Sequence, residues 1–221
     1  MTTRVAYRVS ALLFLSGLAH LVVFFVDGGP WEGPVSWRKA VTFGLSFGLT
    51  LASYTWVAGF VRLRAGWPAV FTAASVVEVA LISVQAWRKV PSHFNESTPF
   101  DTVVTRALTV GGVTLVVCVL ALGVAALRTR DLTPAMRLAV RAGAGTLVVA
   151  MAFGGLMIAE RGGSWKLAHG VAMHGVLLLP LLAWLLDFTT WNDSRKVRTA
   201  ALASGAYAAL IAGAALVNAL A

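Results

Sequence analysis

The titratable side chains of greatest interest lie inside or beside long apolar segments of the chain. They are Glu78 and the four histidines His20, His93, His169 and His174. An ionisable group in the hydrocarbon core of a bilayer costs about 2.5–3.5 kcal/mol on insertion scales, so it normally faces a cavity or a partner. A neutral carboxylic acid at Glu78 can donate or relay a proton. We therefore predict Glu78 as a catalytic acid, and His20 and His174 as further catalytic groups.

Helical spacing gathers polar residues into one stripe on each of three segments. At about 100° per residue, these stripes comprise Ser75, Glu78, Gln85 and Lys89; Ser16, His20 and Asp27; and Thr42, Ser46 and Ser53. Because polar side chains avoid lipid, we expect the stripes to face one another around a cavity in the outer half of the membrane, with Glu78 at its floor. The ordinary alternative is a structural Glu78, hydrogen-bonded to a neighbouring helix or paired with Arg106.

The segment LISVQAWRKVPSHFNESTPFD, residues 81–101, supplies much of the wall and mouth of this expected cavity. Ser36-Trp37-Arg38-Lys39 and Ser164-Trp165-Lys166 echo its Trp-Arg-Lys sequence at the same side of the membrane. The predicted substrate-binding residues are Trp37, Arg38, Lys39, Gln85, Trp87, Arg88, Lys89, His93, Asn95, Arg106 and His169. Interfacial tryptophans with snorkelling cations are the ordinary explanation. A shared anionic partner, such as a lipid headgroup, a phosphate or cofactor carboxylates, is the functional one.

The elements that must position these residues are membrane-spanning helices. The 221 residues are 58% hydrophobic and 12% charged, whereas soluble domains are nearer a quarter charged. Seven apolar runs have the ~20 residues that a bilayer crossing needs: 6–26, 40–60, 67–87, 102–127, 134–158, 169–187 and 199–220. They lack the alternation of strands, so we predict an all-α fold with one seven-helix transmembrane domain over residues 1–221. The first run is too long for a signal peptide and is predicted to be retained.

The distribution of charge predicts the orientation of the chain. One set of loops and helix ends holds eleven Arg and Lys against three acids, and the other holds seven against six. The first set belongs on the cytoplasmic side, which places the N-terminus inside and the C-terminus outside. We therefore predict a multi-pass protein of the cell membrane. Thr98-Pro99-Phe100-Asp101 and Thr133-Pro134 are helix-start signals, and Pro180 is expected to kink its helix.

The sequence predicts neither a metal site nor another cofactor for the interpretation in which Glu78 is a catalytic acid. Cys118 is the one cysteine, and HExxH, P-loop and dinucleotide-binding motifs are not found. Haem b is an alternative, because His20 and His174 are each expected roughly 8–9 Å below the outer surface and can serve as axial ligands. Orientation in the membrane accounts for the basic excess, so nucleic acid is not an expected partner. The expected partners are membrane lipid and a lipid-soluble substrate, and the oligomeric state is left open.

An enzyme acting on a lipid-soluble, isoprenoid-type substrate combines these features best. Glu78 would protonate an alkene or epoxide, aromatic rings would stabilise the cation, and a dry cavity would protect it. In length, in its seven spans and in its intramembrane acid Glu78, the chain resembles the small integral-membrane terpene cyclases of bacteria and fungi. The resemblance implies a lyase or isomerase with a second acid, left open among Asp27, Asp101 and Glu160. A small-molecule transporter and a structural membrane subunit are the remaining alternatives.

Overall fold

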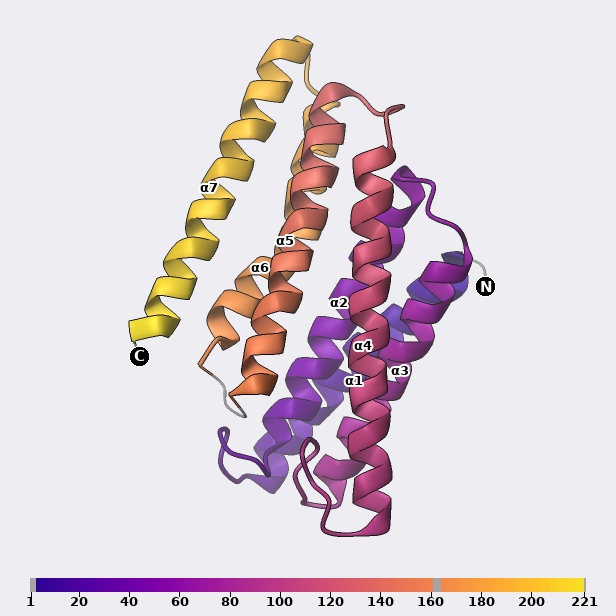
Figure 1. Cartoon of the computed structure of the whole chain (residues 1–221), viewed down its shortest axis with the longest axis vertical. Helices are drawn as coiled ribbons and strands as arrows, with labels where there is room; N and C mark the ends of the chain where they lie inside the picture. Colours follow the sequence, from indigo (N-terminus) through magenta and orange to yellow (C-terminus); the bar gives the residue numbers. More distant parts are fainter. Residues whose placement is uncertain (1–2, 161–163, 221) are drawn as a thin grey trace. The chain divides into compact units, whose positions relative to one another are not determined.

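The computed structural model describes residues 3–160 and 164–220, and within them it contains seven α-helices and no strand. Arg161, one of the seven basic residues on the less basic side, lies outside the described residues. The helices are α1 (Thr3–Asp27), α2 (Trp37–Phe60), α3 (Gly66–Trp87), α4 (Pro99–Arg128), α5 (Pro134–Ala159), α6 (Lys166–Leu186) and α7 (Asp193–Leu220) (Figure 1). Each of the seven is long and apolar enough to cross a membrane. The predicted all-α, multi-pass membrane architecture is confirmed. The helix limits lie within three residues of those expected, except that α7 begins six residues earlier, at Asp193.

The chain divides into two compact units, one of residues up to Thr55 together with Arg64–Cys118, and the other of Trp56–Leu63 together with Val119 onward. The first unit therefore contains α1, α3, and most of α2 and α4. The second contains α5, α6 and α7 with the ends of α2 and α4. The predicted sites Glu78 and His20 belong to the first unit, and His174 belongs to the second.

Close backbone contact between α1 and α2 organises the first unit. A Cβ atom added at Gly44 would lie 2.6 Å from the Cα and N atoms of Gly17, and one added at Gly48 would lie 2.7 Å from the N atom of Phe14. The hydroxyl of Ser10 donates a 2.7 Å hydrogen bond to the carbonyl of Gly48 across the same contact. Small residues thus let the two helices approach closely, as the Gly44-x-x-x-Gly48 spacing indicates.

The second unit is built from α5, α6 and α7, which run up and down in turn and pack side by side (Figure 1). A Cβ atom at Gly143 of α5 would lie 2.9 Å from the carbonyl of Gly175 of α6, so this crossing is also tight. Tyr207 of α7 donates a 2.6 Å hydrogen bond to the carbonyl of Val171 of α6. The α6 helix continues through the buried Pro180 to Leu186.

Both expected helix-start signals are present at the predicted positions. The backbone N–H of Asp101 donates to the hydroxyl of Thr98 at 3.1 Å, and that hydroxyl donates to the Asp101 carboxylate at 2.6 Å. At the start of α5, the Thr133 hydroxyl accepts from the N–H of Met136, and Pro134 occupies the first turn. These caps satisfy donors that the first turn of a helix leaves unpaired.

Candidate functional site

Glu78 lies on the buried face of α3, where it is 3% exposed. Its Oε1 atom is buried and has no hydrogen-bond partner among the described residues. The carboxyl group packs against α4 at Gly111, where any side chain would overlap it. Arg106, the partner considered from the sequence, is exposed on α4 and forms no ion pair with Glu78. The side chain is therefore held by packing and by the lack of a side chain at Gly111.

The polar stripe predicted on α3 is buried as far as Gln85. Ser75 and Gln85 are fully buried, on the same face as Glu78. Ser75 donates to the carbonyl of Phe71, one turn earlier, so its hydroxyl is satisfied within α3. Lys89 departs from the stripe because α3 ends at Trp87 and the backbone of Lys89 turns to a φ of 55°.

The polar stripe predicted on α2 has its hydroxyls satisfied within that helix. The hydroxyls of Thr42, Ser46 and Ser53 each donate to a carbonyl one turn earlier in α2 itself, at 2.6–2.8 Å. Such back-bonding satisfies a hydroxyl in an apolar setting without a partner on another helix. These three residues are therefore accounted for by the helix that carries them.

His20 and two tryptophans form an aromatic cluster in the first unit. The centroids of the His20, Trp37 and Trp87 rings lie 5.0–6.3 Å apart. The indole N–H of Trp87 donates to Nε2 of His20 at 3.1 Å, and Nδ1 of His20 lies 2.8 Å from the carbonyl of Ser16. This arrangement requires the proton of the neutral imidazole on Nδ1. The Nε2 lone pair, which would bind a haem iron, is therefore occupied by Trp87.

Asp27, the last residue of α1, contacts the start of α2 and the residue that follows the end of α3, beside this cluster. The indole N–H of Trp37 donates to the Asp27 carboxylate at 2.6 Å, and the Lys89 ammonium forms an ion pair with the same carboxylate. The Lys89 ammonium also lies 4.4 Å from the centroid of the Trp37 ring. Trp37 is 4% exposed, so it is a packed residue of the core rather than an interfacial anchor.

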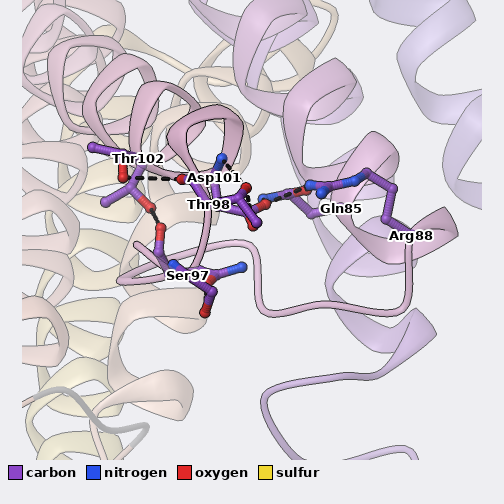
Figure 2. Close-up of polar contacts among 8 residues, drawn as sticks. Gln85, Arg88, Ser97, Thr98, Asp101 and Thr102 are labelled. Atoms are coloured by element: carbon purple, nitrogen blue, oxygen red, sulfur yellow. Dashed lines mark hydrogen bonds and ion pairs between the residues drawn. The ribbon is translucent and has the colours of Figure 1, made fainter.

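Gln85 and Arg88, two of the residues expected at the mouth of a cavity, join Asp101 in a network that holds together α3, α4 and their connection (Figure 2). Asp101 is central: its carboxylate accepts from Gln85 Nε2 at 2.9 Å, from Thr98 at 2.6 Å, and from the Arg88 guanidinium. Arg88 donates to the side-chain oxygen (Oε1) of Gln85 as well. Every member of this network has a hydrogen-bond partner within it, so the main role of the network is structural.

We expect Asp101→Asn to lower the free energy of unfolding by about 2–3 kcal/mol, because it removes the carboxylate on which three donors converge. Asp101 is only 2% exposed, so water does not replace the lost contacts. Denaturant unfolding in one detergent provides the measurement. Arg62→Gln, which breaks the exposed Arg62–Asp131 pair, should change the same free energy by less than about 0.5 kcal/mol. Equal effects of the two substitutions would contradict a structural role for the network.

The segment between α3 and α4 is fixed by further hydrogen bonds from Asn95. The side-chain oxygen of Asn95 accepts from the N–H of Ser97 at 3.1 Å and from its hydroxyl at 2.7 Å. Its backbone carbonyl accepts from Thr105 of α4 at 2.8 Å. Asn95 is therefore a buried turn residue in this structure.

His93 lies in the same segment, with its ring 6.0 Å from that of Phe43 and its Nδ1 atom 2.8 Å from the Ser92 hydroxyl. Burial, and then the charge of Lys39, lowers the pKa of His93 to about 4. An exposed histidine has a pKa of about 6.5, so His93 binds a proton more tightly when the segment is open than when it is closed. Lowering the pH from 6.5 to 4 therefore favours the open segment. The imidazole is therefore held neutral while the segment is closed.

As the pH falls from 6.5 to 4, we expect residues 92–98 to open, because protonation of His93 favours the open form by roughly 3 kcal/mol once complete. Amide hydrogen exchange, corrected for its intrinsic dependence on pH, measures this opening. His93→Gln should remove the pH dependence because glutamine does not titrate. A wild-type segment that stays equally protected at pH 7 and pH 4 would contradict the assignment.

The second unit contains the two remaining histidines. Nδ1 of His169 lies 2.7 Å from the carbonyl of Ala150, and its ring packs against α5 at Gly154. His174 is half-buried and forms no hydrogen bond with another described residue. His169 therefore ties α6 to α5, and His174 is the imidazole of this unit that has no hydrogen-bond partner among the described residues.

Gly111 is the residue of this site that the sequence analysis missed. The available signal was the pair Gly111-Gly112 inside a long apolar segment, where glycine lowers helix stability. Within residues 3–160 and 164–220, the residues able to bind a metal form no group of three or more that could hold an ion. Comparisons with protein-family models, with curated proteins and with solved structures found no match to this chain.

Proposed function

We propose that the protein is a membrane enzyme that uses Glu78 as an acid on a lipid-soluble, isoprenoid-type substrate. The observation that carries the proposal is the buried Oε1 atom of Glu78, which has no hydrogen-bond partner among the described residues. A carboxyl group without a partner in an apolar setting is costly to keep, and such strain is most often tolerated at a functional site. This supports a role in proton transfer over a purely structural one.

The proposed reaction begins with transfer of the Glu78 proton to an alkene of the substrate. The π electrons form the new C–H bond, a carbocation results, and a second alkene closes on it. The Glu78 carboxylate then takes a proton back from carbon, which restores the acid and ends the reaction, so the net change is an isomerisation. Tyr54 and Phe71, whose stacked rings lie 4.1 Å apart, are buried in the same unit and offer π faces of the kind that stabilise cations.

This proposal keeps the sequence-based orientation, with the N-terminus inside and the protein in the cell membrane. It also keeps His20 as a predicted accessory group, with the resemblance to membrane terpene cyclases as its precedent, while the predicted role of His174, which lies in the second unit, stays a separate prediction. Trp87 already engages His20 in the structure, so His174 is the freer of the two imidazoles. The haem alternative fits less well, because Trp87 would have to leave the Nε2 atom of His20 before an iron could bind.

The direct test compares lipid extracts of cells that express the wild type, Glu78→Gln, or no protein. Mass spectrometry with chromatography should reveal a cyclised isomer in cells with the wild type that is absent from cells without the protein and reduced by at least ~100-fold in Glu78→Gln. Glu96→Gln, at an exposed acid of the segment between α3 and α4, is the matched control and should retain full activity. A transporter would instead move an unchanged compound. Equal product from Glu78→Gln and the wild type would overturn the proposed role of Glu78.

A further inference from the structure

Arginine side chains gather where α4 ends and α5 begins, within the second unit of the chain. They are Arg62, Arg128, Arg130, Arg137 and Arg141, and Asp131 is the one acidic residue of segments 56–63 and 119–159. Two contacts converge on the connection between the helices. Arg62 pairs with Asp131 at 3.2 Å, and Arg137 donates to the backbone carbonyl of Arg130 at 3.2 Å. This junction therefore carries a local excess of positive charge.

The fold itself uses one of these arginines. The guanidinium of Arg141 donates to the carbonyls of Ala126, Leu127 and Thr129 at 2.9–3.2 Å. The last carbonyls of a helix lack partners within it, so Arg141 satisfies the end of α4. The other arginines are not needed for that purpose.

Two of the others have no protein partner for their charge. The side chains of Arg128 and Arg130 form no hydrogen bond or ion pair with another described residue. Arg62 and Asp131 are 80% and 67% exposed, so water screens their ion pair and it stabilises the junction little. A guanidinium carries five N–H donors in a planar fork, which matches the oxygens of a phosphate. The free groups at this junction are therefore suited to an anion.

An apolar lane leads along α4 to these arginines. Leu120, Val124 and Leu127 are spaced by four and three residues, so they lie on one face of the helix, and all three are exposed. Arg128 is four residues after Val124 and so lies on the same side of α4. A lipid beside this face would have an acyl chain along the apolar lane and its headgroup at the arginines.

We propose that this junction binds an anionic phospholipid, whose phosphate accepts hydrogen bonds from Arg128 and Arg130. Arginine binds phosphate through two parallel hydrogen bonds, a geometry that lysine does not offer. A zwitterionic lipid brings an ammonium that the surrounding arginines repel, so a headgroup of net negative charge is preferred. The apolar lane favours a lipid over a soluble phosphate. The predicted orientation places this lipid in the cytoplasmic leaflet, and the proposal does not depend on the role of Glu78.

The test is a lipid titration of the detergent-solubilised protein, with bound lipid counted by native mass spectrometry. The probes are phosphatidylglycerol and phosphatidylcholine with the same chains, and phosphatidylglycerol should bind at least ~tenfold more tightly. Arg128→Gln/Arg130→Gln should weaken the binding of phosphatidylglycerol by about tenfold or more, because two charges at the phosphate are lost. Arg4→Gln/Arg8→Gln removes the same charge from exposed positions of α1 and should bind as the wild type does.

Inorganic phosphate serves as a competitor that lacks acyl chains. It should not displace phosphatidylglycerol when both are present at the same concentration, and displacement would overturn the assignment to a lipid. The proposal is also overturned if the two lipids bind equally, or if Arg128→Gln/Arg130→Gln retains wild-type affinity. Equal weakening by Arg4→Gln/Arg8→Gln would overturn it as well, because the effect would then be one of total charge. If the double variant misfolds, Arg128→Gln alone should still weaken binding by about threefold or more.

Discussion

Glu78→Leu should raise the free energy of unfolding by about 1–3 kcal/mol, because it removes a buried polar group that lacks a partner. Leucine fills a similar volume on the buried face of α3 and carries no polar atom. The measurement is denaturant unfolding in a fixed detergent, with helix content followed by circular dichroism. Residues at functional sites often cost stability in this way, whereas structural polar residues contribute to it.

Gln85→Leu is the matched control, because Gln85 lies on the same face of α3 and is equally buried but has partners. Its side chain donates to Asp101 and accepts from Arg88, so its removal takes one hydrogen bond from each of them. We expect that substitution to lower the free energy of unfolding by about 1–3 kcal/mol. If Glu78→Leu destabilises the protein as much as Gln85→Leu does, Glu78 has a structural partner and the account of its role is wrong.

Gly44→Leu should be among the most damaging single substitutions in the first unit. Even a Cβ atom at this position would lie 2.6 Å from backbone atoms of Gly17, so α1 and α2 would have to separate. Separation would also strain the hydrogen bond from Ser10 to the Gly48 carbonyl. We expect a loss of about 3 kcal/mol in the free energy of unfolding, at the upper end of the range for overpacking.

Gly59→Leu provides the control within the same helix. A Cβ atom at Gly59 would meet nothing within 4 Å, so leucine there has room. Its effect on the free energy of unfolding should be within about 0.5 kcal/mol. Parallel unfolding curves of the two variants give the comparison. Equal stability of Gly44→Leu and Gly59→Leu would show that close contact between α1 and α2 does not support the fold.

The sequence predicts the helices of this protein well because their cause is local. A run of about twenty apolar residues must pair its own backbone in lipid, and helix formation is the solution. The starts at Thr98 and Thr133 depend on residues within one turn, so they are also predictable. The buried stripe of Ser75, Glu78 and Gln85 follows from helical spacing alone.

The partners of the polar residues could not be predicted in the same way. Trp87 and His20 are 67 residues apart, and their hydrogen bond depends on how α3 is rotated against α1. Similar depth in the membrane does not set that rotation. Likewise, the Asp101 network depends on the path of the segment between α3 and α4, including the left-handed turn at Lys89. The sequence indicated which residues are buried but not which atoms they contact.

The role assigned to Glu78 can be tested directly with a membrane-permeant carbodiimide, which adds to neutral carboxylic acids in apolar surroundings. Peptide mass spectrometry locates the adduct, so no knowledge of the substrate is needed. We predict a carbodiimide adduct on Glu78, which has a buried oxygen without a partner, and none on Asp101, whose carboxylate accepts three hydrogen bonds. A Glu78 that stays unlabelled under conditions that label other carboxyl groups of the folded protein would contradict the account.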